Sequence, residues 1–220
     1  MEPLLDAGEF PVVLGGDCTI LLGSMLALKR RGRYGLLFID GNADFFQPEA
    51  EPNGEGASMD LAFATGHGPT LLTDIEGRGP LVRLEDVVAL AYRDHKDQEE
   101  FGSQPLPKEL KALDLPVVRE MGIEAATREA VDHLLRPELD GFFIHLDADC
   151  LDDAIMPAVD FRVPGGLSWG ELEMALRIAM GSGKAVGLEV TIYNPRLDED
   201  GSAGHGLSEA LAAALEHAAR

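Results

Sequence analysis

Short, wholly apolar segments alternate with longer amphipathic segments along most of this chain. Strands that are apolar on both sides are typical of a parallel sheet buried between two layers of helices, because each face of the sheet packs against helices. The apolar segments predict strands near residues 10–14, 34–40, 87–92, 141–147 and 185–191, and a short one at 115–118. We therefore predict a three-layer α/β/α fold with a mainly parallel sheet.

The amphipathic segments predict the helices of the outer layers. They lie at residues 19–32, 124–135 and 168–183, with a last one at 206–219. The helix near residue 168 has a clear start signal, because Ser168 can cap it and Glu171, three residues later, can return the hydrogen bond. Residues 47–80 are rich in glycine and proline and predict an irregular excursion.

The charge balance narrows the classes of partner. A net charge of -21 repels nucleic acid phosphates and anionic membrane surfaces. No apolar run is long enough to cross a bilayer, and the first ten residues lack the basic and apolar regions of a signal peptide. Two cysteines, Cys18 and Cys150, are too few for a disulfide scaffold. We therefore expect a cytoplasmic protein that binds neither nucleic acid nor membranes.

Acidic residues stand at the carboxyl ends of three predicted strands. They are Asp17, then Asp40 and Asp44, then Asp147, Asp149 and Asp152. A single acidic strand end usually caps the next helix. Three together, at the sheet edge where α/β proteins form their sites, also suggest a cation site, because clustered carboxylates repel each other unless they share protons or a metal. Oxygen-rich clusters favour Mg²⁺, Mn²⁺ or Ca²⁺.

Five segments carry a family resemblance. In order, they read VVLGGDCT, FIDGNADF, HLDADCLDDAIMPAV, GGLSWGELEMAL and GLEVTIYNP. In this order and approximate spacing they resemble the ureohydrolase family, which includes arginase, agmatinase and formiminoglutamase. The resemblance implies a three-layer α/β/α fold, a small-molecule substrate and a pair of Mn²⁺ ions that activate a bridging hydroxide. Two metals that share one water lower its pKa and hold it against an unreactive guanidino or amidino carbon.

The resemblance also implies a set of metal ligands. These would be Cys18, Asp40, Asn42, Asp44, Asp147 and Asp149. Cys18 and Asn42 depart from the family pattern, which has histidine at both positions. The amide oxygen of Asn42 would be a weaker donor that suits Ca²⁺ or Mg²⁺, whereas a Cys18 thiolate would favour a softer ion such as Zn²⁺. Cys18 can equally be a small buried hydrophobe. We expect one or two Mn²⁺ ions, with Zn²⁺ or Mg²⁺ as alternatives.

Catalytic roles follow from the same resemblance. Asp149 and Asp152 match a paired ligand and a nearby supporting acid, and His67 is the nearest substitute for a proton-shuttling histidine whose place falls near Ala57. His67 can also be an ordinary surface histidine. The glutamate that receives the guanidinium in the family would fall at Ile192, which argues against a classical arginine or agmatine substrate.

Two further residues lie near these positions. His145 precedes Asp147 by two residues on the same predicted strand, so it would share its face and could support the site through a hydrogen bond. Glu189 matches an acidic position of the family that is not the guanidinium receptor.

At 220 residues, the chain is expected to form one ureohydrolase domain, residues 1–220. Only nine residues precede Phe10, so the βα segment that usually precedes this strand in the family is expected to be missing. The first strand would then be an unprotected edge, from which we expect a homo-oligomer or a fragment.

Three functions are consistent with these features. The first is a metal-dependent hydrolase of a C–N bond in a guanidino or amidino compound. The second is a non-catalytic family member that keeps the fold and one metal or none. The third is a hydrolase of another bond on a related α/β scaffold. Metal content separates the first from the second, and urea or ammonia release from guanidino compounds separates the first from the third.

Overall fold

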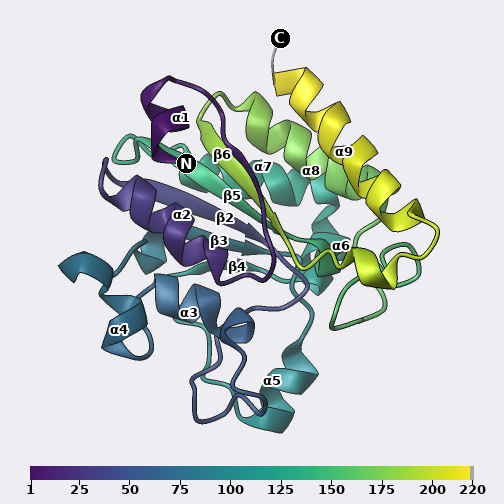
Figure 1. The fold of residues 1–220 in the computed structure, drawn as a ribbon, viewed down its shortest axis with the longest axis horizontal. Helices are drawn as coiled ribbons and strands as arrows, with labels where there is room; N and C mark the ends of the chain where they lie inside the picture. Colours follow the sequence, from purple (N-terminus) through teal and green to yellow (C-terminus); the bar gives the residue numbers. More distant parts are fainter. Residues whose placement is uncertain (219–220) are drawn as a thin grey trace.

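The computed structural model describes residues 1–218 and has one six-stranded sheet in the order β1-β6-β5-β2-β3-β4 (Figure 1). Every neighbouring pair of strands is parallel. The strands are β1 (Val12–Leu14), β2 (Tyr34–Ile39), β3 (Val87–Leu90), β4 (Lys111–Leu113), β5 (Gly141–Asp147) and β6 (Ala185–Thr191). The predicted parallel α/β fold is confirmed, and five of the six strands lie where the apolar segments placed them.

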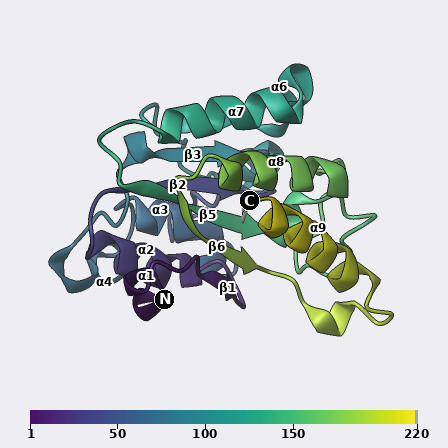
Figure 2. The same cartoon turned by 90° about the horizontal axis from the view of Figure 1, so that it is seen from above.

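Helices cover both faces of this sheet (Figure 2). On one face lie α1 (Glu2–Asp6), α2 (Ile20–Lys29), α3 (Asp60–Ala64) and α4 (Thr70–Thr73). On the other lie α6 (Leu115–Met121), α7 (Ile123–Leu134), α8 (Trp169–Gly181) and α9 (Ser202–Ala218). Within β2, Leu36 and Phe38 pack in the core between the sheet and helices α2 and α3. Leu37 and Ile39 pack in the core on the opposite face, with α7 and α8. This alternation explains why the strands are apolar throughout.

The strand predicted at 115–118 is wrong, because this segment opens helix α6. Asp114 caps that helix by accepting a hydrogen bond from the backbone N–H of Val117, and Pro116 stands in the first turn, where its missing N–H costs nothing. The one strand that the apolar segments did not predict is β4, which ends immediately before Asp114.

The other predicted helices form close to their expected bounds. The Ser168–Glu171 capping box is present at the start of α8, as predicted. Helix α9 begins at Ser202, earlier than expected, and position 219 of its predicted range lies outside the described residues. The excursion at 47–80 contains α3, α4 and the 3-10 turns Gly56–Met59 and Ile75–Gly77. Other short elements are α5 (His95–Phe101) and the 3-10 turns Leu84–Asp86, Ala148–Cys150 and Pro195–Leu197.

Strand order decides what meets at the carboxyl edge of the sheet. β5 lies between β2 and β6, with Ile39 opposite Leu146 and His145 opposite Glu189. Residues that follow β2 therefore lie beside the end of β5. β1 forms one edge of the sheet, and the side chain of Leu14 on it is 74% exposed. Within residues 1–218, no helix combines the length and apolar character that a membrane span requires.

Candidate metal centre at the strand ends

Four buried side chains bring potential ligand atoms together beyond the ends of β2 and β5. They are Cys18, Asp40, His145 and Asp147, and their ligand atoms all lie within 4.8 Å of one another. Within the described chain, no other group of three or more His, Cys, Asp or Glu side chains gathers as closely. Asp40 and Asp147 therefore converge at one sheet edge, as predicted.

Each member of this cluster is positioned by its element. Asp40 follows β2 directly, and Asp147 is the last residue of the neighbouring β5. Cys18 lies in the turn between β1 and α2, where its Sγ donates to Asp147 Oδ2 at 2.7 Å. His145 shares the face of Asp147 because the two are separated by one residue on the strand. Its ring stacks on Phe38, with 4.5 Å between ring centroids.

A chain of buried polar contacts fixes the orientation of the His145 ring. Its Nδ1 lies 2.7 Å from Glu189 Oε1, and Ser24 Oγ donates to Glu189 Oε2 at 2.6 Å. Its Nε2 lies 3.7 Å from Asp40 Oδ2. Neither of these last two atoms has a hydrogen-bond partner, although both side chains are buried. His145 Nε2 and Asp40 Oδ2 are thus two potential metal-ligand atoms in the cluster that make no hydrogen bond.

Asp149 and Asn42 bind each other beside this cluster. Asn42 Nδ2 donates to Asp149 Oδ2 at 2.7 Å, and the backbone N–H of Gly41 donates to Asp149 Oδ1 at 3.0 Å. The backbone N–H of Asp149 donates to Asp147 Oδ1 at 2.7 Å. Both carboxylate oxygens of Asp149 therefore already accept one hydrogen bond from the protein. The assignment of Asn42 and Asp149 as metal ligands stays a prediction.

Asp60, at the start of α3, was not predicted. It is fully buried, and its Oδ2 has no hydrogen-bond partner. Its negative charge adds to the raised pKa of the Cys18 thiol, after burial and Asp147. It also adds to the raised pKa of His145, where burial opposes the rise and Glu189 is the main cause of it. No spacing motif connects Asp60 to the strand ends, and only the packing of α3 beneath the sheet brings it there.

Burial and mutual repulsion perturb the acids strongly. Burial, followed by the charges of neighbouring carboxylates, raises the pKa values of Asp40, Asp44 and Asp147 well above their ordinary range. Burial likewise raises the pKa of Asp60 well above that range, against the opposing charge of His145. Such a group must hold protons or a cation, because its charges cannot all be desolvated together.

The cluster borders a cavity of about 560 Å³. Its lining includes Cys18, Asn42, Asp44, Asp147 and Asp149, together with six further acids: Asp17, Glu51, Glu55, Asp94, Asp97 and Asp160. Among the lining residues, all within the described chain, none is Lys, Arg or His. The cavity is therefore strongly anionic.

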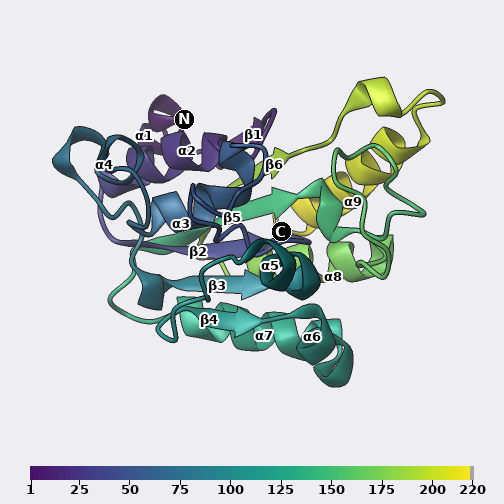
Figure 3. The ribbon, with the colours of Figure 1, turned by 90° about the horizontal axis from the view of Figure 1, so that it is seen from below.

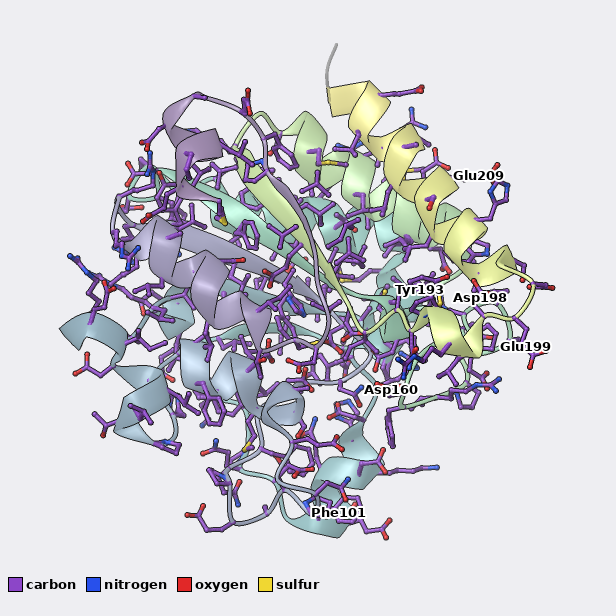
Figure 4. All side chains as sticks on the ribbon, viewed as in Figure 1. Phe101, Asp160, Tyr193, Asp198, Glu199 and Glu209 are labelled. Carbon is purple, nitrogen blue, oxygen red and sulfur yellow. The ribbon has the colours of Figure 1, made fainter. Side chains whose placement is uncertain are left out.

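The cavity walls come from distant parts of the chain. Figure 3 shows α5 on the side of the sheet to which the strand arrowheads of β2 and β3 point. Phe101 on α5 and Asp160 in the loop after β5, both labelled in Figure 4, line the cavity. Ala57 and Ile192 line it too. Ile192 has a φ of 68°, a left-handed conformation that is costly for a β-branched residue.

Two of the predicted catalytic residues lie outside this lining. The Asp152 carboxylate accepts from the backbone N–H groups of Ala154 and Gly165, at 3.0 and 2.6 Å, and these bonds lower its pKa. Asp152 thus fastens the loop that follows β5. His67 Nδ1 lies 3.2 Å from Thr65 Oγ1, and neither His67 nor Asp152 is among the residues that line the cavity. Their catalytic roles stay predictions.

Comparison with known proteins places these features in a family context. The model of the arginase family matches residues 1–217. The chain is 32% identical over 203 residues to an arginase of Brevibacillus brevis, covering 91% of this chain and 66% of that protein. It is 28% identical over 198 residues to an arginase of Staphylococcus aureus (strain MRSA252), covering 89% and 64% respectively. The chain thus spans 64% of the length of the S. aureus relative.

The structural comparison agrees with the sequence comparison. The solved arginase from Bacillus caldovelox superimposes with a TM-score of 0.84 and 29% identity, covering 97% of this chain and 71% of that chain. The six-stranded parallel sheet and its helical layers therefore have a close counterpart among solved structures.

Proposed function

Since the chain belongs to the arginase family, we propose that it is a metal-dependent hydrolase that cleaves a C–N bond of a cationic guanidino or amidino compound. Water would add its oxygen to the central carbon, the C–N bond would break, and the leaving nitrogen would depart as an amine. The other product would be urea or a formamide-like compound.

The observation that carries this proposal is the pair of unpartnered buried atoms, Asp40 Oδ2 and His145 Nε2. They belong to a cluster that also offers the sulfur of Cys18 and a carboxylate oxygen of Asp147. A divalent ion fits such a donor set, because it satisfies the free atoms and offsets the crowded negative charge. When bound, this ion would supply Lewis-acid activation of water. The resemblance to the family implies Mn²⁺, and Zn²⁺ and Mg²⁺ are the alternatives.

The cavity supports a cationic substrate. Its walls carry carboxylates without a basic side chain to neutralise them, so a guanidinium or amidinium group would be attracted and an anionic compound repelled. Ile192 offers no carboxylate at the position where the family receives the guanidinium. The substrate's positive charge would therefore be met by other acids of the cavity, such as Asp44 and Asp160.

The second candidate function is binding without turnover. Asn42 in place of a family histidine and Ile192 in place of a family glutamate favour it, because each removes a group that the family uses. A chain of this kind would still bind a cation at the cluster but would release no product.

Product release from a panel of guanidino and amidino compounds tests the two candidates. The protein is stripped with a chelator and reloaded separately with Mn²⁺, Zn²⁺ or Mg²⁺, and urea and ammonia are measured. Turnover that needs the metal and is lost in Asp147→Asn supports the hydrolase, provided that circular dichroism shows the variant folded. Metal binding without turnover of any compound supports the second candidate. The homo-oligomer stays a prediction.

A further inference from the structure

We propose that His145 is the nitrogen ligand of a single divalent ion, held together with Cys18, Asp40 and Asp147, and that this donor set selects Zn²⁺ over Mn²⁺. The inference deepens the proposed function and rests on it for the role of the metal. The experiments below measure metal binding and not turnover, so the ligand assignment and the proposed hydrolase function can be refuted separately.

The amide of Asn42 is already bound by a neighbouring acid. Its Nδ2 donates to Asp149 Oδ2 at 2.7 Å. The opposite orientation would place the amide oxygen against a carboxylate oxygen, which is repulsive, so the donor must face Asp149. Position 42 therefore supplies no nitrogen ligand and stabilises Asp149 instead.

The contact with Glu189 places a proton on Nδ1 of His145. Glu189 Oε1 lies 2.7 Å from its Nδ1, and a carboxylate can only accept, so Nδ1 carries the proton. In the neutral ring Nε2 then carries the lone pair, and in a protonated ring its proton must leave before a metal can bind. A histidine whose Nδ1–H is bound by a carboxylate, with Nε2 free, has the arrangement found in metal-binding histidines of proteins. Ser24 and the stacked Phe38 ring hold this arrangement in place.

The distance from His145 Nε2 to Asp40 Oδ2 is 3.7 Å. At 3.7 Å it is too long for a hydrogen bond, and both atoms lack any other partner. Two ligands of a tetrahedral ion at about 2.0–2.3 Å from the metal lie roughly 3.3–3.8 Å apart. The separation therefore fits two ligands of one ion and is too long for a direct hydrogen bond.

The four ligand atoms of the cluster favour Zn²⁺. One sulfur, one imidazole nitrogen and two carboxylates offer four donors, the number that Zn²⁺ prefers, and sulfur favours it over the harder Mn²⁺. The Cys18 thiol donates to Asp147 at 2.7 Å, so binding would release the thiol proton to solvent and leave the sulfur as a thiolate ligand.

Spectroscopy of the natural chain tests the ligand set directly. Chelator-treated protein is titrated with Co²⁺, a coloured stand-in for Zn²⁺, and its stoichiometry is measured by calorimetry. We expect one ion per chain and a thiolate-to-cobalt charge-transfer band. X-ray absorption of the Zn²⁺-loaded protein should show one sulfur at about 2.3 Å, nitrogen and oxygen at about 2.0–2.2 Å, and scattering from an imidazole ring. Absence of the sulfur or of the imidazole overturns the inference, as does an equally tight second ion.

Variants test the role of each group. His145→Gln should weaken Zn²⁺ binding by at least about 10-fold, and Glu189→Gln, which disturbs the ring's orientation, by about 10–100-fold. His205→Gln, a change at an exposed histidine paired with Glu209, is the matched control and should bind Zn²⁺ as the natural chain does. Thermal melting checks that each variant folds. If His145→Gln does not fold, the imidazole scattering of the natural chain decides.

The outcomes separate the inference from the proposed function. One Zn²⁺ bound through sulfur and imidazole, with no product from any guanidino or amidino compound, leaves the inference standing and removes the proposed function. Turnover with two Mn²⁺ ions and no imidazole contact does the reverse.

Discussion

His145 Nε2 and Asp40 Oδ2 face each other across 3.7 Å, and neither atom has a hydrogen-bond partner although both side chains are almost wholly buried. A buried polar atom left without a partner costs about 1–3 kcal/mol. Two such atoms in one cluster are the arrangement expected of two ligands to a bound ion. A divalent ion satisfies both at once, and the following predictions depend on it.

Metal binding should stabilise the fold. A ligand that binds only the native state adds about 2.7 kcal/mol at a concentration 100 times its dissociation constant. In a domain of this size, that corresponds to a rise of roughly 5–10 °C in melting temperature. Calorimetry of the chelator-treated protein with and without Zn²⁺ measures the shift. Asp147→Asn should lose most of it, and an equal melting temperature in all samples would rule out an ion at the cluster.

The stability of the metal-free protein should fall as pH rises. The pKa values of Asp40, Asp44, Asp60 and Asp147 are raised in the fold, first by burial, so folding favours their protonated forms. The stability linked to these protons is complete below the unfolded pKa of about 3.9 and is lost as pH rises from there through the folded pKa values. Urea unfolding between about pH 5 and 8 should show a declining free energy of unfolding.

A single substitution tests the origin of that decline. Asp60→Asn removes one buried charge while keeping the shape of the side chain. The charge that the natural side chain must desolvate at high pH is absent from the variant, so its free energy of unfolding should exceed that of the natural chain more at pH 8 than at pH 5. Glu209→Gln on the surface of α9 is the control and should keep the natural slope. A natural slope in Asp60→Asn would place the origin of the decline elsewhere.

The substitution Ile192→Glu should improve recognition of a guanidinium. It places a carboxylate in the cavity wall at the position where the family receives this group. A charge-assisted hydrogen bond contributes about 1.5–3 kcal/mol, so affinity for an alkylguanidine should rise about 10–100-fold. Calorimetric titration measures this, with Ile192→Gln as the neutral control of the same length. Equal affinities of the two variants would mean that position 192 does not face the substrate.

The substitution Asn42→His should favour a second ion. It supplies an imidazole where the amide now donates to Asp149, and the combination with Cys18→His should strengthen the effect. We expect Mn²⁺ bound per chain to rise from about one or none toward two, with any C–N hydrolase activity rising alongside. Calorimetric titration of Mn²⁺ decides, and unchanged stoichiometry and affinity would show that residue 42 does not face a metal.

Much of the fold could be predicted because it depends on local patterns. Wholly apolar strands such as β2 and β5 require cover on both faces, which already implies three layers. The strand prediction for residues 115–118 was wrong because four apolar residues match a short strand, although Asp114 caps a helix there. A short apolar run has no periodicity that separates the two structures.

The candidate site was only partly predictable because it depends on strand order. Asp40 and Asp147 could be named from their positions at strand ends. The contact between His145 and Glu189 requires β5 and β6 to be neighbours in one particular register, which no local pattern states. Asp60 reaches the cluster from an irregular excursion, so its role depends entirely on tertiary packing.

The buried cluster of Cys18, Asp40, His145 and Asp147 can be examined for a metal by crystallography. The Zn²⁺-loaded protein is crystallised, and anomalous data are collected on both sides of the zinc edge. We expect one strong anomalous peak within bonding distance of Asp40 Oδ2 and His145 Nε2, with the Cys18 sulfur and an Asp147 oxygen completing the site. A map without a peak there, or with its peak away from these atoms, would show that the cluster is not a metal centre.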